Sequence, residues 1–110
     1  VIHFMNVPKA LGLDQTLASV LRTFPNGATA MAEMARSTEP NLIGCTQVTE
    51  INYTAGVDLV DVLPAEFELV TDYTLGICTA AAAPANARVL ADLLAGPASE
   101  AIRRQGGFEF

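Results

Sequence analysis

The chain has few of the residues that usually bind metals or carry out catalysis. Its 110 residues include one histidine, His3, and two cysteines, Cys45 and Cys78. The cysteines form no CxxC or Cys/His spacing, so a zinc site has almost no ligands to draw on. No glycine-rich phosphate loop is present, and a single histidine supports no Ser/His/Asp or Cys/His arrangement. We therefore expect no catalytic residue, no metal and no cofactor.

Charge is also scarce, and positive charge most of all. Charged residues make up 16% of the chain, and six Lys and Arg stand against twelve Asp and Glu, for a formal net charge of -6. This balance argues against nucleic-acid backbones and anionic membranes as main partners. Thr, Asp, Gly or Pro interrupts every apolar stretch before the length of about eighteen residues that a membrane helix needs.

Apolar residues, by contrast, are abundant. They make up 51% of the chain and the mean hydropathy is +0.35, which excludes intrinsic disorder and predicts one modest core. So little charge on so apolar a small chain suggests a missing partner surface, either another lobe or a second copy of the chain. The opening Val1-Ile2-His3-Phe4 carries no targeting peptide, and we expect the chain to be the interior of something longer.

Helices are predicted at four places. Residues 3–11 have helical apolar spacing with Gly12 as a left-handed cap, and Asn26 is a plausible N-cap for a helix that runs to about Ser37. In that helix Met31 and Met34 are interpreted as core filler. A third helix starts at Pro84 and ends at Gly96-Pro97, and a fourth covers residues 98–104.

Strands are predicted for residues 19–24, 42–47, 57–64 and 67–79. The run 42–47 becomes polar at its carboxyl end, as a buried parallel strand does, and ligands of open α/β sheets collect beyond such ends. Strands that alternate with helices over crossover-length links predict an α/β fold with a mostly parallel sheet.

Several weak motifs in a fixed order resemble a known family. The stretch 44–51 (GCTQVTEI), followed by residues 56–60 and Leu63-Pro64, resembles the type II periplasmic binding proteins of ABC transporters, particularly the molybdate-binding branch. Residues 93–101 and the tail Gly106-Gly107-Phe108 are similar to the end of those proteins. The resemblance covers nearly the whole chain.

The resemblance implies a periplasmic carboxyl-terminal portion of a two-lobed α/β protein that holds a small oxyanion, such as molybdate or tungstate, and passes it to a membrane permease. Residues 1–72 would belong to the second lobe and residues 73–110 to the return crossing and the C-terminal helices. Tyr73 would place its hydroxyl on the anion, and the Cys45-Thr46 backbone would give an amide contact, with Gln47 beside it. Neutral N-H and O-H donors suit such a ligand.

Each site residue also has a purely structural interpretation. Tyr73 fits an amphipathic core aromatic, and Thr46 or Thr49 fits a helix cap. Cys45 and Cys78 are interpreted as buried small hydrophobes rather than a disulfide. The carboxylate pairs Asp58/Asp61 and Glu66/Glu68 fit a solvated edge better than acid–base chemistry, and Arg103 and Arg104 fit a helix C-terminus.

Two other functions stay open at this stage. The same fold serves as the ligand-sensing domain of a transcriptional regulator, and an enzyme on this scaffold would need converging ionisable groups, which the sequence scarcely offers. Because the helices after Pro84 lack a sheet to cover, we also expect the isolated chain to form a homodimer.

Overall fold

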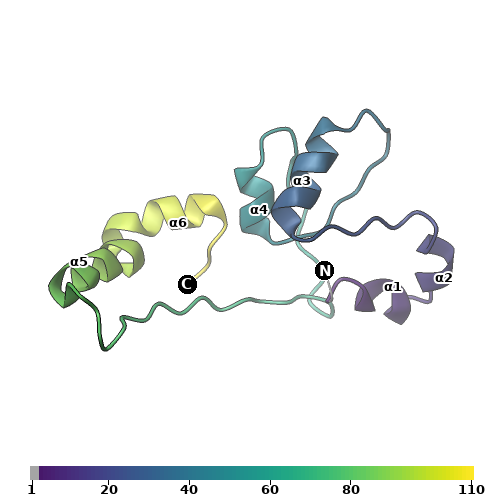
Figure 1. Cartoon of the computed structure of the whole chain (residues 1–110). Coiled ribbons are helices and arrows are strands. Elements are labelled where there is room, and N and C mark those ends of the chain that lie inside the picture. Colours follow the sequence, from purple (N-terminus) through teal and green to yellow (C-terminus); the bar gives the residue numbers. More distant parts are fainter. Residues whose placement is uncertain (1–2) are drawn as a thin grey trace. The chain divides into compact units, whose positions relative to one another are not determined.

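The computed structural model describes residues 3–110 and divides the chain into two compact units, the first ending at Leu69 and the second running from Val70 to Phe110 (Figure 1). The first unit contains helices α1 (Asn6–Ala10), α2 (Asp14–Leu17), α3 (Gly27–Arg36) and α4 (Val48–Tyr53). The second contains α5 (Pro84–Ala95), the short 3-10 helix η1 (Pro97–Ser99) and α6 (Glu100–Gly106). Each unit is therefore described by itself.

The predicted helix ends are confirmed where a local signal sets them. Gly12 follows α1 with a left-handed φ of 68°. Asn26 caps α3, because its Oδ1 accepts the backbone N–H of Thr29 at 2.8 Å and so satisfies one of the free amides of the first turn. Pro84 opens α5, where its missing N–H costs nothing, and Gly96 and Pro97 end it.

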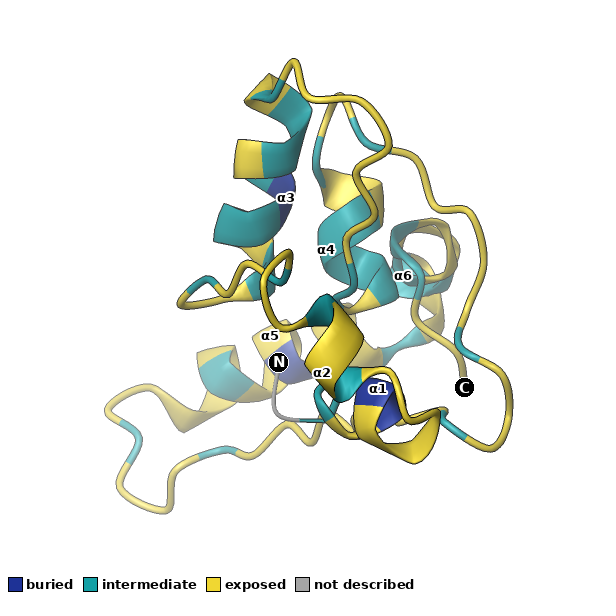
Figure 2. Ribbon diagram, turned by 90° about the vertical axis from the view of Figure 1, so that its right-hand side faces the viewer, coloured by how far each residue is buried: buried dark blue, intermediate teal, exposed yellow. Residues whose placement is uncertain are grey.

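The first unit is organised around one methionine of α3. Met31 is 1% exposed and is the buried residue of α3, and Figure 2 colours part of that helix as buried. The chain before α4 passes close to it: a Cβ added at Gly44 would lie 2.5 Å from Met31 Cε and 3.1 Å from Met34 Sδ. The interpretation of this methionine pair as core filler is confirmed for Met31, while Met34 is half-buried.

A hydrogen-bonded corner joins the helices of the second unit. The guanidinium of Arg103 in α6 donates to the carbonyls of Ala95 and Gly96 at 3.0 and 2.9 Å, and its Nε donates to Ser99 Oγ at 3.1 Å. One side chain thus donates to two carbonyl groups at the end of α5, where the helix itself supplies no donors. The prediction of Arg103 and Arg104 at a helix C-terminus is confirmed.

No strand occurs within residues 3–110. The prediction of strands at 19–24, 42–47, 57–64 and 67–79 is thus not matched by the described structure, where these segments are turns and irregular chain. A segment becomes a strand only when a neighbour supplies the partners for its N–H and C=O groups, so local pattern alone does not decide it. The α/β fold class and the lobe boundaries at residues 72 and 73 remain predictions.

The apolar side chains of these segments lie largely at the surface. Ile43 and Val60 are each 96% exposed, and the chain as a whole exposes 8786 Å². Two separate compact units of these sizes would expose about 7,000 Å² by the usual scaling of surface with mass. The excess of about 1,800 Å² is roughly twice the area of about 800 Å² that one partner contributes to a standard protein–protein interface. No helix among residues 3–110 has the length and apolar character to span a membrane.

Replacing Met31 should measurably destabilise the first unit. Met31→Ala removes the most deeply buried side chain and leaves a cavity against Gly44, so we expect the free energy of unfolding to fall by about 2–5 kcal/mol. Met34→Ala, three residues along the same helix and half-buried, is the control and should cost less. Urea denaturation followed by circular dichroism measures both; equal losses would contradict the central place of Met31.

Candidate functional site

Three of the predicted site residues form the approach to α4. Cys45 and Thr46 are half-buried, Gln47 is exposed, and α4 begins at Val48. The predicted capping role of Thr46 or Thr49 is wrong, because the N-cap position is Gln47. Thr46 instead donates its hydroxyl to the carboxylate of Glu50, one turn into α4. The hydroxyl proton of Thr46 is thereby engaged, so the donor that remains on this residue is the backbone N–H.

The start of α3 lies against this same approach. A Cβ added at Gly27 would overlap Thr46 Oγ1 and Glu50 Oε2 and lie 2.7 Å from Thr46 Cβ, so only glycine permits the contact. The Glu50 carboxylate therefore sits beside the first residue of α3, where the helix dipole favours negative charge. Thr46, Glu50 and Gly27 together fix how the chain enters α4.

Burial affects the chemistry of Cys45. Partial burial raises the pKa of the Cys45 thiol above its ordinary value of 9.0, because desolvation disfavours the thiolate. Cys78 in the second unit is exposed, and both cysteines are free. The interpretation of both cysteines as buried residues is wrong for Cys78, and that of two unpaired thiols stays a prediction.

Tyr73 belongs to the second unit and lies in its non-helical N-terminal segment. Its side chain is 65% exposed, so the interpretation as a core aromatic is wrong. Its ring meets the ring of Phe108 edge-on, with centroids 5.7 Å apart and an interplanar angle of 71°. An edge-to-face pair restrains the phenol while leaving most of its surface open to solvent.

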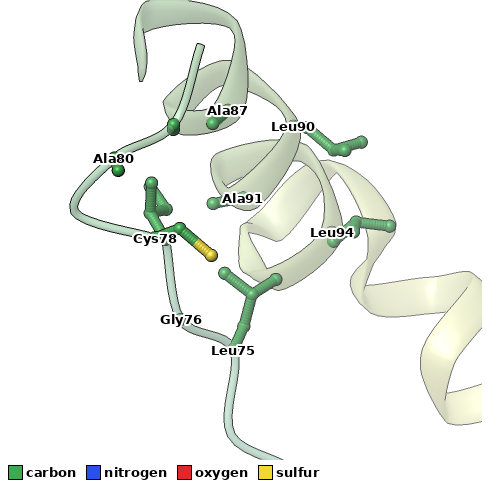
Figure 3. A pocket seen from close by; sticks show the side chains of 10 residues that line it. Leu75, Gly76, Cys78, Ala80, Ala87, Leu90, Ala91 and Leu94 are labelled. Carbon is green, nitrogen blue, oxygen red and sulfur yellow. The ribbon is translucent and has the colours of Figure 1, made fainter. Parts of the chain in front are cut away.

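An apolar groove of about 480 Å³ runs beside α5 in the second unit. Figure 3 shows Leu75 and Cys78 pointing toward the face of α5 that carries Ala87, Ala91 and Leu94. The groove contains no ionisable group other than the Cys78 thiol. It can receive an apolar surface but offers few donors for a polar solute.

The remaining candidates take part in local structure. His3 Nε2 lies 2.6 Å from the carbonyl oxygen of Phe67, to which it can only donate. Asp58, Asp61 and the Glu66/Glu68 pair are exposed, in agreement with their interpretation as solvated charges. Within residues 3–110 no group of three or more His, Cys, Asp or Glu side chains is arranged to bind a metal ion.

Comparison with known proteins gives one match, which extends over almost the entire chain. Residues 3–109 match the model of the bacterial extracellular solute-binding protein family. The chain belongs to this family. Membership indicates binding of a small solute in transport, in general with an ABC permease as partner, and typically without catalysis. No curated protein and no solved structure matches.

Sequence reasoning missed two residues of this solute-binding chain that the geometry brings out. No sequence pattern singles out Gly27, whose lack of a side chain admits Thr46 and Glu50. Phe108 was noticed only as part of a Gly-Phe tail, although its ring contacts Tyr73. A signal for the second existed: a glycine after a helix that ends in basic residues predicts a left-handed cap that turns the next residue back toward the helix.

The two cysteines should differ in reactivity. At pH 8 we expect Cys78 to react several-fold faster with Ellman's reagent than Cys45, because Cys78 is exposed and burial keeps the Cys45 thiol protonated. The rate at Cys45 should continue to rise above pH 9. Any stabilisation from its protonated form is present at neutral pH and lost as the pH rises through the thiol range.

The variants Cys45→Ser and Cys78→Ser each leave one thiol and separate the two rates. Equal rates in the folded protein, or a faster Cys45, would contradict the burial of Cys45. Both thiols should react alike in 6 M guanidinium chloride, which controls for the reagent itself.

Proposed function

We propose that this chain is the carboxyl-terminal portion of a periplasmic substrate-binding protein that binds a small oxyanion such as molybdate or tungstate and delivers it to an ABC permease. The observation that carries the proposal is the family match over residues 3–109, which already indicates a solute-binding role. The oxyanion specificity rests on the resemblance of residues 44–51 and of Tyr73 to the molybdate-binding branch.

The donor chemistry of the proposed site supports a small anion. The backbone N–H groups of Cys45, Thr46 and Gln47 in the first unit can each donate a hydrogen bond without carrying a positive charge, and so can the Tyr73 hydroxyl in the second unit. Selectivity among anions then follows from donor geometry and cavity size. The Thr46 hydroxyl takes no part in this proposal, because Glu50 accepts it.

The apolar surface supports the proposal that the chain is part of a two-lobed protein with an α/β fold. A second lobe would cover the groove beside α5 and part of the excess exposed area of about 1,800 Å². Segment 42–47, an apolar run that becomes polar at its carboxyl end, and segment 57–64 are the predicted strands of the first unit with the most exposed apolar side chains, and a neighbouring sheet would supply both hydrogen-bond partners and cover for them.

Removing the Tyr73 hydroxyl should weaken oxyanion binding. We expect the 110-residue chain to bind molybdate weakly, with a dissociation constant in the millimolar range, because binding must offset lost translational freedom with only part of the donors. Tyr73→Phe should weaken it further by about tenfold, since a hydrogen bond to a charged group contributes about 1.5–3 kcal/mol. Equilibrium dialysis with molybdate, followed by molybdenum analysis, measures both constants.

Tyr53→Phe is the matched control, because Tyr53 is 91% exposed and lies at the end of α4. It should leave the dissociation constant unchanged. Equal binding by Tyr73→Phe and the unsubstituted chain would remove Tyr73 from the site. Tight binding by the isolated chain would contradict its being part of a larger receptor. Reading the coding sequence upstream of Val1 tests that second point directly, since a further α/β lobe is expected there.

The isolated chain should self-associate through the face of α5. Leu90 lines the groove and is 55% exposed, so we expect a homodimer in sedimentation experiments, and Leu90→Glu should shift it toward monomer by placing a charge in the buried face. Val89→Glu, on the same helix but outside the groove, should leave the dimer intact. A compact monomer that binds no apolar dye would contradict this prediction.

A further inference from the structure

The C-terminal tail of the second unit has an ordered course that brings Phe108 against the candidate ligand residue Tyr73. Gly107 follows α6 with a φ of 101°, in the left-handed region that favours glycine. The N–H of Phe108 donates to the carbonyl of Arg103, and that of Gly107 to the carbonyl of Arg104, both at 3.0 Å. This pair of bonds is a Schellman motif, which sets the direction of the residue after the glycine.

The helix that carries this motif is itself anchored. Arg103 donates to Ala95, Gly96 and Ser99, so the start of the tail is held at the end of α5. Beyond Phe108, the Phe110 ring lies 4.2 Å from the Arg103 guanidinium carbon and 4.5 Å from that of Arg104, as in cation–π contacts. Both sides of Phe108 are therefore restrained.

We propose that Phe108 is a positioning residue for Tyr73: its ring, fixed by the Gly107 turn, holds the phenol so that the hydroxyl is presented to the solute in one direction. The contact is the edge-to-face pair at 5.7 Å. Tyr73 is 65% exposed, and the edge-on Phe108 ring restricts the rotamers that the phenol can adopt. Fixing a donor before binding raises affinity by removing the ordering cost. The solute part of this proposal rests on the oxyanion function proposed above.

The composition of the chain allows a test that does not depend on any ligand. The chain contains no tryptophan and two tyrosines, Tyr53 and Tyr73. In a Tyr53→Phe background, tyrosine emission anisotropy and near-ultraviolet circular dichroism therefore report on Tyr73 alone. Phe108→Leu should lower both signals, because the phenol gains rotational freedom. Phe24→Leu, the same change at a half-buried residue of the first unit, is the control and should alter neither.

Gly107→Ala provides a second variant that keeps the Phe108 ring. A left-handed φ of 101° is strained for alanine, so the turn should shift and the Tyr73 signals should fall in the same direction. Far-ultraviolet circular dichroism checks that α5 and α6 remain folded in both variants. If both variants stay helical and the Tyr73 signals do not change, the positioning role is overturned.

Binding then tests whether the positioning matters for the solute. With molybdate as the probe in equilibrium dialysis, Phe108→Leu should raise the dissociation constant by about three- to tenfold, and this effect should vanish in a Tyr73→Phe background. An equal effect in both backgrounds would overturn action through Tyr73. Reduced Tyr73 signals in Phe108→Leu, with no molybdate binding by any variant, would support the positioning contact and overturn the oxyanion function, so the two failures are distinguishable.

Discussion

The close approach of α3 to the chain that enters α4 is the constraint on which the first unit depends. Because residue 27 has no side chain, Thr46 and Glu50 can lie against the first turn of α3, and Met31 can be buried one turn further along. The Glu50 carboxylate then lies beside the positive end of α3 and accepts the Thr46 hydroxyl. The missing side chain at residue 27 thus fixes how α3 packs against α4, how the chain enters α4 and how the segment with the predicted amide donors is oriented.

The second unit achieves order differently, through backbone hydrogen bonds rather than a buried core. Ala91 is its only side chain in the buried class within the described residues. Arg103 compensates by joining the end of α5 to α6, and the Gly107 turn directs the tail. Hydrogen bonds of this kind contribute about 1 kcal/mol each and depend on exact geometry more than on burial. Because hydrogen bonds set the course of the chain, an exposed aromatic such as Tyr73 can have a defined neighbour without being part of a core.

Local signals in the sequence predicted helices α1, α3, α5 and α6 but not α2 and α4, and the predicted strands are not found among residues 3–110. A cap such as Asn26 or an opening residue such as Pro84 acts on amides within one turn, so the sequence alone contains the whole interaction. Strand formation needs a partner distant in sequence. For the site, Tyr73 and residues 45–47 were predicted through family resemblance, whereas the approach of Gly27 to Thr46 and Glu50 and the Tyr73–Phe108 contact depend on how distant segments meet, which spacing does not encode.

How strongly the proposed donors hold an anion depends on whether the exposed apolar surface around them is covered, because cover excludes water and lowers the local dielectric constant. Neutral donors such as a phenol and backbone amides hold an anion strongly only where water is excluded, because water screens and competes for each hydrogen bond. The net charge of -6, and the Glu50 carboxylate that accepts the Thr46 hydroxyl, repel an anion in an open site. The proposed donors lie within the strand-like segments 42–47 and 67–79, so a surface that covers each segment would remove water from around its donors as well. On the proposed function, the surface that covers the apolar side chains is also the one that creates affinity for the solute. An uncovered chain should therefore self-associate and bind the solute weakly.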